Sequence, residues 1–324
     1  MMGWKILAAV AVLSAASTAT AAAATPHWQV SALPLPAGLE GSSSTVVAHD
    51  GHGGYTATVG APQGEVIVTW RDGEPTEHDL PAGQQYLRVW GESRDDTLLL
   101  GTLDHKLLTL DDSGYHAVST AQFTMVEWAV LGPHGDILVM ADAADGSTSV
   151  QHSTLADPGA WQPLAGVTPG SEPIAVDDDG AVLVNDPDGS YVLRDGVVQR
   201  LTAPEGSAAY PPSGGSIKHG VVVGSGYPTQ FGATQALKWT APGTVPQVLD
   251  RGVGATDVNS HGVVVGTDAD EAPLAWVHGT AATDLPLPAG KTVGIPMFID
   301  DDGTIVGNVT APLEGLNHAV VWRH

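Results

Sequence analysis

The feature that most constrains the fold is a pattern of about forty residues that recurs along the chain. Its clearest copy runs from Asp257 to Gly290, and neighbouring copies start at Ser216 and Phe298. In each copy a turn ending in glycine leads into a Val- and Ile-rich stretch that closes on a second glycine, and a later stretch ends in tryptophan. These positions are Gly220, Gly224 and Trp239, then Gly262, Gly266 and Trp276, then Gly303, Gly307 and Trp322.

Earlier stretches repeat the same order of elements. They are Val46–Gly83, Leu87–Ser119, Val126–Gly166 and Glu172–Pro204. Turn glycines at Gly135, Gly180, Gly220, Gly262 and Gly303 are 45, 40, 42 and 41 residues apart. Periods of roughly 40–50 residues with about four short strands are typical of β-propeller blades. Helix-pair repeats share this period, but β-branched runs and dense Gly and Pro exclude them here.

The two ends of the folded chain complement each other. The last unit reaches His324 after its third expected strand, while the segment QVSALPLPAG from Gln29 matches the fourth-strand ending TDLPLPAG before Gly290. An unpaired outer strand would expose backbone donors and acceptors. We therefore predict an all-β, seven-bladed β-propeller whose last blade combines Gln29–Pro36 with Ile295–Arg323. The alternative is six or eight blades, if the irregular third unit is not a single blade.

The repeated glycines and tryptophans have structural roles in this fold. The second strands of the last three units are apolar throughout, as expected when neighbouring blades cover both faces. We expect their glycines to permit close approach between blades. We expect the recurrent tryptophans to pack between blades, with ligand stacking as the alternative.

Composition limits the partners of this chain of 324 residues. It has 36 acidic and 12 basic side chains, a net charge of −24 and a pI of about 4.5. These values argue against nucleic acids and anionic membranes, which attract basic proteins. Without cysteine there is no disulfide. We expect one domain, a monomer and no bound cofactor, with Ca²⁺ as the exception considered below.

The first residues have the pattern of a secretory signal peptide. Lys5 precedes an apolar stretch from Ile6 to Val12, and small residues continue to Ala24, where Ala22 and Ala24 suit a cleavage site. The alternative, an anchor helix, needs about 20 strongly apolar residues, and Ser and Thr interrupt this segment. We predict removal of residues 1–24 and export of a propeller formed by residues 25–324.

The last three units resemble the extracellular HAF repeat family. The residues that carry the resemblance are Asn259, Gly262, Val264, Val265, Gly266, Trp276, Asp284, Leu285 and Pro286, followed by His318, Ala319 and Trp322, with Val320 replacing the usual Phe. The resemblance implies a secreted repeat protein without an assigned reaction. It supplies no catalytic residues.

One candidate site lies at the turns between first and second strands. Four of these turns carry His52, His134, His219 and His261, and two others carry Asp178-Asp179 and Asp301-Asp302. We expect the turns to ring one mouth of the central channel, where they suit a cation or proton-linked site. The alternative is that polar residues simply suit an exposed turn before glycine. Ligands of one ion must lie within about 2–2.6 Å of it. We expect turns on different blades to lie too far apart to share an ion.

A second candidate is the opposite face, formed by loops between second and third strands. We predict ligand contacts from Tyr227 and Phe231 on the longest loop, and from Asp186, Asp188, Asp268, Asp270 and Glu271. Exposed aromatics beside carboxylates suit a sugar, a peptide or a basic partner. The alternate carboxylates could ligate Ca²⁺, although neither group has the spacing of a twelve-residue calcium loop. The alternative is that they are solvated acidic loops.

Two hypotheses for function follow. The first is a secreted, non-enzymatic binding or envelope-associated propeller that uses its acidic loop face. The second is a propeller hydrolase or lyase acting on an extracellular glycan or lactone, with His and carboxylate groups as acid and base. The second requires at least one His and one carboxylate within hydrogen-bond reach in a pocket.

Overall fold

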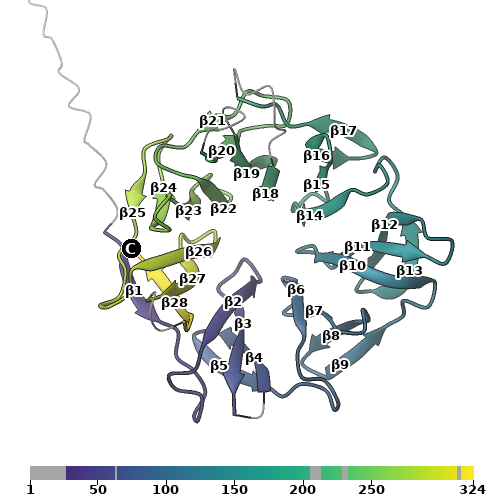
Figure 1. Cartoon of the computed structure of the whole chain (residues 1–324), viewed down its shortest axis with the longest axis horizontal. Coiled ribbons are helices and arrows are strands. Elements are labelled where there is room, and N and C mark those ends of the chain that lie inside the picture. The colour runs from purple at the N-terminus through teal and green to yellow at the C-terminus, as the bar shows by residue number, and fades with distance from the viewer. Residues whose placement is uncertain (1–26, 63, 205–212, 228–232, 312–314) are drawn as a thin grey trace, which may run out of the picture.

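The structure is a computed structural model that describes residues 27–62, 64–204, 213–227, 233–311 and 315–324. These residues form seven four-stranded antiparallel sheets arranged in a ring around a central axis (Figure 1). The irregular third unit forms a single blade, so the predicted seven-bladed β-propeller is confirmed and the alternatives of six or eight blades are excluded. Residues 1–24, the predicted signal peptide, lie outside the described residues. No described segment forms a helix long and apolar enough to cross a membrane.

Each blade is an antiparallel sheet. In blades 1 to 6 the four strands follow chain order from the axis outward, and in blade 7 the outermost strand is β1. The strands are β2 (Ser44–His49), β3 (Tyr55–Ala61), β4 (Gly64–Arg71) and β5 (Glu74–His78) in blade 1; β6 (Arg88–Glu92), β7 (Leu98–Gly101), β8 (Leu107–Asp111) and β9 (Gly114–Val118) in blade 2; β10 (Phe123–Leu131), β11 (Asp136–Ala143), β12 (Thr148–Thr154) and β13 (Asp157–Pro163) in blade 3; β14 (Glu172–Val176), β15 (Val182–Asp186), β16 (Gly189–Arg194) and β17 (Val197–Arg200) in blade 4; β18 (Ser213–Lys218), β19 (Val221–Gly226), β20 (Gln235–Trp239) and β21 (Gln247–Val248) in blade 5; β22 (Gly254–Val258), β23 (Val264–Thr267), β24 (Pro273–Trp276) and β25 (Thr283–Asp284) in blade 6; and β26 (Val293–Ile299), β27 (Ile305–Thr310), β28 (His318–Arg323) and β1 (Gln29–Ala32) in blade 7.

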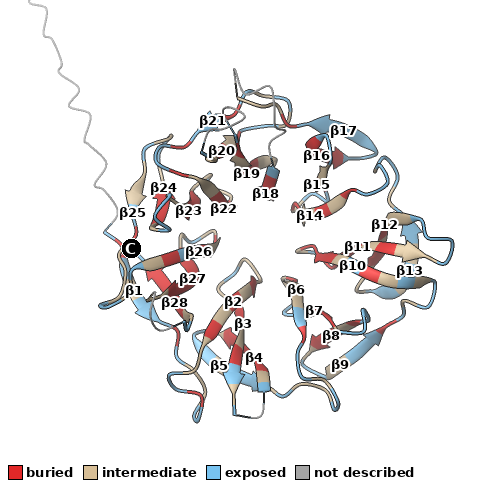
Figure 2. Cartoon of the chain, in the orientation of Figure 1, coloured by how far each residue is buried: buried red, intermediate tan, exposed pale blue. Residues whose placement is uncertain are grey.

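Burial changes from the middle of each blade to its outer edge (Figure 2). In blade 2, β7 is buried at every position, whereas β17 of blade 4 is exposed at every position. Second and third strands lie between two neighbouring blades, so both of their faces need apolar side chains. The outermost strands have solvent on one side and tolerate polar residues.

The ring closes as predicted. In blade 7, β1 pairs antiparallel with β28, with Gln29 opposite Arg323 and Ala32 opposite Val320. The next amide, of Leu33, donates a hydrogen bond to the carbonyl of Ala319 at 3.0 Å. The N-terminal strand therefore covers the outer edge of β28 and gives blade 7 its fourth strand.

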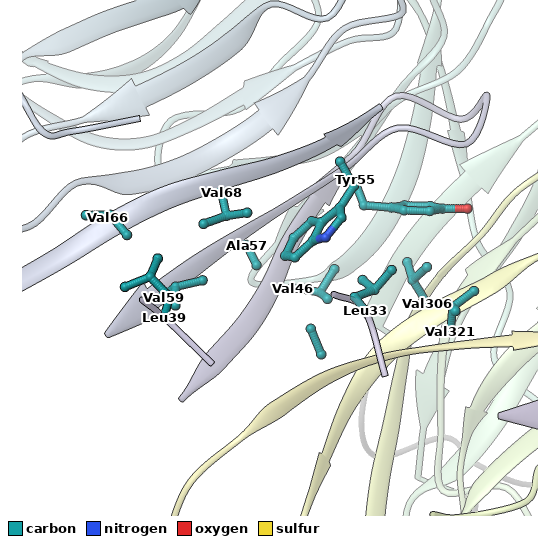
Figure 3. Close-up of a cluster of buried hydrophobic side chains, with 12 residues drawn as sticks. Leu33, Leu39, Val46, Tyr55, Ala57, Val59, Val66, Val68, Val306 and Val321 are labelled. Atoms are coloured by element: carbon teal, nitrogen blue, oxygen red, sulfur yellow. The ribbon is translucent and has the colours of Figure 1, made fainter. Parts of the chain in front are cut away.

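A cluster of buried side chains seals the junction between the first and last blades. It joins Val46 and Tyr55 of blade 1 to Val306 and Val321 of blade 7, and Leu33 lies beside them (Figure 3). Burial of apolar area contributes roughly 25 cal/mol per Å². The junction is therefore held by apolar packing as well as by strand pairing.

The recurrent tryptophans pack between blades, as predicted. Trp70, Trp239, Trp276 and Trp322 are at most 1% exposed. Each indole N–H donates to a backbone carbonyl just after the outermost strand of the preceding blade; the acceptors are Pro34, Thr202, Asp250 and Pro286 respectively. Each of these rings removes roughly 150–250 Å² from water. Their burial excludes ligand stacking at these positions.

The expectation for the second-strand glycines is wrong in one respect: the close approach lies within a blade and not between blades. A Cβ added to Gly224, Gly266 or Gly307 would collide with the backbone of Ser213, Gly254 or Ile295 respectively, on the first strand of the same sheet. The cause is a β-bulge that brings the first strand over each glycine.

Candidate functional site

A cavity of about 230 Å³ lies at the centre of the ring and is bordered by all seven blades. One lining residue from each blade, in order, is His49, Trp90, Leu131, Ala175, Ser216, Asp257 and Phe298. Its rim includes Gly51, Pro133 and Asp301, which belong to the turns between first and second strands. The cavity is thus the central channel, and these turns form one of its mouths.

Bulges in the innermost strands shape the wall of this channel. Every first strand (β2, β6, β10, β14, β18, β22 and β26) has an extra residue in its pairing with the second strand. The bulged residues that line the cavity are Val47, Trp90, Ile174, Gly215 and Thr256. A bulge re-aims side chains and interrupts the alternation of a strand. The wall therefore presents side chains that a regular strand would direct into the blade.

His49 and Asp300 form a pair in the wall, at the junction of blades 1 and 7. The Nδ1 atom of His49 lies 3.2 Å from Oδ1 of Asp300, and the hydroxyl of Tyr55 donates to Oδ2 of Asp300 at 2.6 Å. Phe298 stacks on the imidazole, with ring centroids 4.4 Å apart and an interplanar angle of 17°. The imidazole is therefore fixed, and its Nε2 has no partner among the described residues.

Two further buried carboxyl groups connect neighbouring blades. Asp257 accepts from the hydroxyl of Ser216 in blade 5 at 2.6 Å and from the amide of Ile299 in blade 7 at 2.8 Å. Glu92 of blade 2 is bound by Arg71 and by the hydroxyl of Thr56, both in blade 1. These groups tie adjacent sheets together around the axis.

Burial and mutual proximity shift the pKa values of these groups. Burial raises the pKa of Glu92 to about 7, although Arg71 and Thr56 favour its charged form. Burial likewise raises the pKa of Asp257 against the effects of His49 and Ser216. Burial alone would lower the pKa of His49, but the hydrogen bond to Asp300 and the charges of Asp257 and other wall carboxylates raise it overall. Glu92, Asp257 and His49 therefore bind protons more tightly in the wall than the same groups do in water.

At the turn-side mouth, basic groups converge on one carboxylate. Asp178 of blade 4 pairs with Arg94 of blade 2 at 2.8 Å, with Lys218 of blade 5 at 3.2 Å and with His219 at 3.1 Å. Burial acts in the opposite direction, but Lys218, Arg94 and His219 together lower the pKa of Asp178. The neighbouring Asp177 accepts from the amides of His219 and Gly220, both at 2.7 Å.

The four predicted turn histidines are all exposed and do not come together. His219 alone pairs with a carboxylate, through Asp178. The amide of His52 donates to Asp50 in its own turn, and Nδ1 of His261 lies 3.5 Å from the hydroxyl of Ser260. His134 is exposed beside Pro133, which lines the cavity rim.

The predicted carboxylates belong to two loops, one on blade 4 and one on blade 6, and each loop makes its own contacts. Asp186 is held by two hydrogen bonds from Arg200, at 3.1 and 2.8 Å, and accepts from the amide of Asp188. Asp268 accepts from the amide of Asp270 and pairs with Arg251.

Of the remaining predicted loop residues, Glu271 and Tyr227 are described. Glu271 donates its amide to the carbonyl of Asp268. Tyr227 is 44% exposed, and Phe231 lies outside the described residues. Within the part of the chain that is described, no three His, Cys, Asp or Glu side chains are grouped to hold a metal ion.

Comparison with known proteins identifies a shared fold. No protein-family model and no curated protein matches the sequence. Among the solved structures that match over nearly the whole chain are catalytically inactive histidine-to-alanine virginiamycin B lyase from Staphylococcus aureus with quinupristin (16% identity, TM-score 0.56, 92% of this chain and 100% of that chain), oligogalacturonate lyase in complex with manganese (12%, 0.63, 87% and 89%) and YCF48 bound to D1 peptide (11%, 0.57, 93% and 96%). At these identities the likeness shows that this chain is a β-propeller.

Proposed function

We propose that this protein is an exported, non-enzymatic propeller that binds an extracellular ligand in its central channel. The observation that carries the proposal is the cavity of about 230 Å³, whose wall combines apolar, aromatic and hydrogen-bonding side chains from all seven blades. Small-molecule pockets are usually roughly 300–1,000 Å³. A cavity of this size suits one sugar ring or one terminal group of a larger ligand.

The hydrogen bonding of the wall supports binding over catalysis. Both carboxylate oxygens of Asp300 accept hydrogen bonds from the protein, and so do both oxygens of Asp257. These carboxylates position the wall instead of facing a substrate with a free oxygen. Export is proposed from the signal-peptide pattern of residues 1–24 and from the resemblance to HAF repeats, and a net charge of −24 suits a soluble exported protein.

The proposal is tested by locating the ligand site with matched bulky substitutions. Glycan and peptide arrays probed with residues 25–324, with and without Ca²⁺, supply a ligand. Val47→Phe adds bulk to the channel wall, whereas Val197→Phe makes the same change on the outermost strand of blade 4, where Val197 is 58% exposed. We expect Val47→Phe to weaken binding about tenfold or more, as measured by calorimetry, and Val197→Phe to leave it unchanged. Equal affinities would place the ligand elsewhere, and Tyr227→Ala would then test the loop face.

A second candidate is acid–base catalysis, as in a propeller hydrolase or lyase. The observation in its favour is His49, whose Nδ1 contacts Asp300 while Nε2 has no partner among the described residues. A histidine oriented by a carboxylate is a common general acid or base. Prolonged incubation of the array ligand with the protein, followed by mass spectrometry, distinguishes the candidates. A product that forms with the natural chain and not with His49→Gln would establish catalysis and contradict the binding proposal.

A further inference from the structure

Arg88 lies over two indole rings beside the central cavity. Its guanidinium carbon is 3.9 Å from the ring centroid of Trp90 and 4.7 Å from that of Trp128. The two indoles meet edge to face, with centroids 5.2 Å apart. Trp90 is the bulged residue of β6 and lines the cavity, while Trp128 is on β10 of the next blade. The bulge of β6 thus places a cation and two aromatic rings together at the channel.

The cluster lies at the mouth opposite the turn histidines. Arg88 is the first residue of β6 and Glu92 the last, and the turn that follows Glu92 is on the turn-histidine side. Arg88 pairs with Gly101, which ends β7 and precedes a loop between second and third strands. Arg88 is an exposed residue. Arg88 therefore lies on the loop-face side of Trp90, which lines the cavity.

Arg88 has no carboxylate partner among the described residues, whereas seven other basic residues form ion pairs. In the described residues, ion pairs with Asp or Glu are made by Arg71, Arg94, Lys106, Arg194, Arg200, Lys218 and Arg251. Arg88 makes neither an ion pair nor a hydrogen bond with any described residue, although acidic residues outnumber basic ones by 36 to 12. Glu127, the bulged residue before Trp128, is exposed and makes no ion pair with Arg88. The guanidinium is therefore held by the rings with its N–H groups unused.

The indoles add donors and no acceptor. The Nε1 atoms of Trp90 and Trp128 are buried without a hydrogen-bond partner within the described residues. Buried donors usually find an acceptor. The five N–H groups of a guanidinium match a carboxylate in a two-point contact, and stacking on aromatic rings restricts the plane of the group. The two indole N–H groups are buried, so the guanidinium of Arg88 is the part of this cluster that offers N–H groups to a ligand.

We propose that Arg88 recognises a carboxylate on the ligand, held against Trp90 and Trp128 at the loop-side mouth. The inference rests on the proposed ligand site in the channel, because Trp90 lines that cavity. The carboxylate belongs to an acidic sugar or to the C-terminus of a peptide, and both offer the same two oxygens.

The test compares acids with their neutral counterparts. Glucuronic acid is compared with glucose, and N-acetylalanine with its amide, by following the indole N–H signals of Trp90 and Trp128 by NMR, assigned with Trp90→Phe and Trp128→Phe. We expect at least one acid to bind about tenfold or more tightly than its neutral counterpart. Preference for glucuronic acid identifies a sugar acid, and preference for N-acetylalanine identifies a peptide terminus. Arg88→Gln should abolish the preference and Arg88→Lys should restore it in part, whereas Arg194→Gln, at an exposed pair with Asp179, should not change it.

The outcomes separate this inference from the proposed function. Equal binding of acids and neutral counterparts, no binding of either, or a preference that survives Arg88→Gln would overturn the role of Arg88. If Val47→Phe still blocks the array ligand in that case, the channel remains the ligand site. If Val47→Phe has no effect but the acids shift the Trp90 signal through Arg88, the channel proposal fails and the mouth is a separate anion site.

Discussion

The channel wall and the outer loops are both rich in carboxyl groups, yet the two regions use them in opposite ways. In the wall, burial raises the pKa of Asp257 and Glu92, and each connects its own blade to a neighbour. In the loops, Asp104 and Asp145 are exposed, and hydrogen bonds from Lys106 and Ser147 lower their pKa values. Asp104 and Asp145 each accept a hydrogen bond from a hydroxyl group two residues away in the same loop.

The difference shows that position in the ring decides the role of an acidic residue. A wall carboxyl loses water and must find donors on another blade, so its removal leaves those donors unpaired. A loop carboxylate keeps its water and orders a few residues. We therefore expect substitutions in the wall to affect the whole ring and equivalent substitutions in the loops to remain local.

The largest contrast is expected for two glycines. Gly266 lies opposite the bulge of β22, where an added Cβ collides with the carbonyl of Gly254, whereas Gly146, in a loop of blade 3, has open space and a φ of 79°. Gly266→Ala should lower the free energy of unfolding by about 3 kcal/mol or more, because the fixed backbone cannot move away. Gly146→Ala should cost about 1–2 kcal/mol from φ alone. Denaturant titration measures both, and equal losses would show that the bulge is not tightly packed.

The next contrast is between Asp257 and Asp145. Asp257→Ala leaves the hydroxyl of Ser216 and the amide of Ile299 without an acceptor, so we expect a loss of about 3 kcal/mol. Asp257→Asn keeps one acceptor oxygen and should recover part of it. Asp145→Ala should leave the unfolding midpoint unchanged. Similar midpoints for Asp257→Ala and Asp145→Ala would contradict the linking role of the wall.

The pH dependence of stability should also separate the two regions. The folded state binds the proton of Glu92 more tightly than the unfolded state, so the free energy of unfolding should fall as the pH rises from about 4.5 to about 7, by up to about 3 kcal/mol. His49 acts in the same direction, because its raised pKa contributes stability below its ordinary pKa of 6.5 that is lost as the pH passes the folded value. Loop carboxylates with lowered pKa values instead lose their contribution as the pH falls below about 4.

Glu92→Gln isolates the contribution of the wall. Denaturant titrations between pH 4.5 and 8 should show a flatter pH profile for this variant than for the natural chain. A profile that keeps its slope would assign the pH dependence to groups outside the wall.

The smallest effect is expected in a loop ion pair. Arg194 and Asp179 of blade 4 form such a pair, with side chains 43% and 49% exposed. Ion pairs with an exposed partner contribute about 0–1 kcal/mol, reduced further by salt. Arg194→Ala should therefore shift the unfolding midpoint only slightly, with less effect in 0.5 M salt than in 0.05 M salt. A loss comparable to that of Asp257→Ala would remove the distinction between the regions.

The ring could be predicted from the sequence because its signals are local and repeated. The Val-rich strands, the tryptophans such as Trp276 and the matching ends at Gln29 and Gly290 each identify a blade or its edge. The wall could not be predicted in the same way, since His49 and Asp300 are 251 residues apart and meet only after closure. The sequence signal that could indicate a wall residue is an ionisable side chain inside an otherwise apolar first strand, as at Asp257.

The bulges were missed for a related reason. A strand pattern read with a period of two assigns Trp90 and Thr256 to regular positions, while the extra residue re-aims them. The glycine opposite a bulge, such as Gly266, was visible but was attributed to contact between blades. The prediction of loop and turn residues rests on residue type, and type alone does not show which side chains converge.

The central claim is that ring closure couples ionisable groups from separate blades into one wall. NMR titration of the histidine side chains tests it most directly. Burial and Arg71 lower the pKa of His78 on the outermost strand of blade 1, whereas the wall raises that of His49. We predict that His49 titrates above 6.5 and His78 below it, and that Asp300→Asn lowers the pKa of His49 alone. A His49 that titrates below 6.5, or that does not respond to Asp300→Asn, would contradict the account.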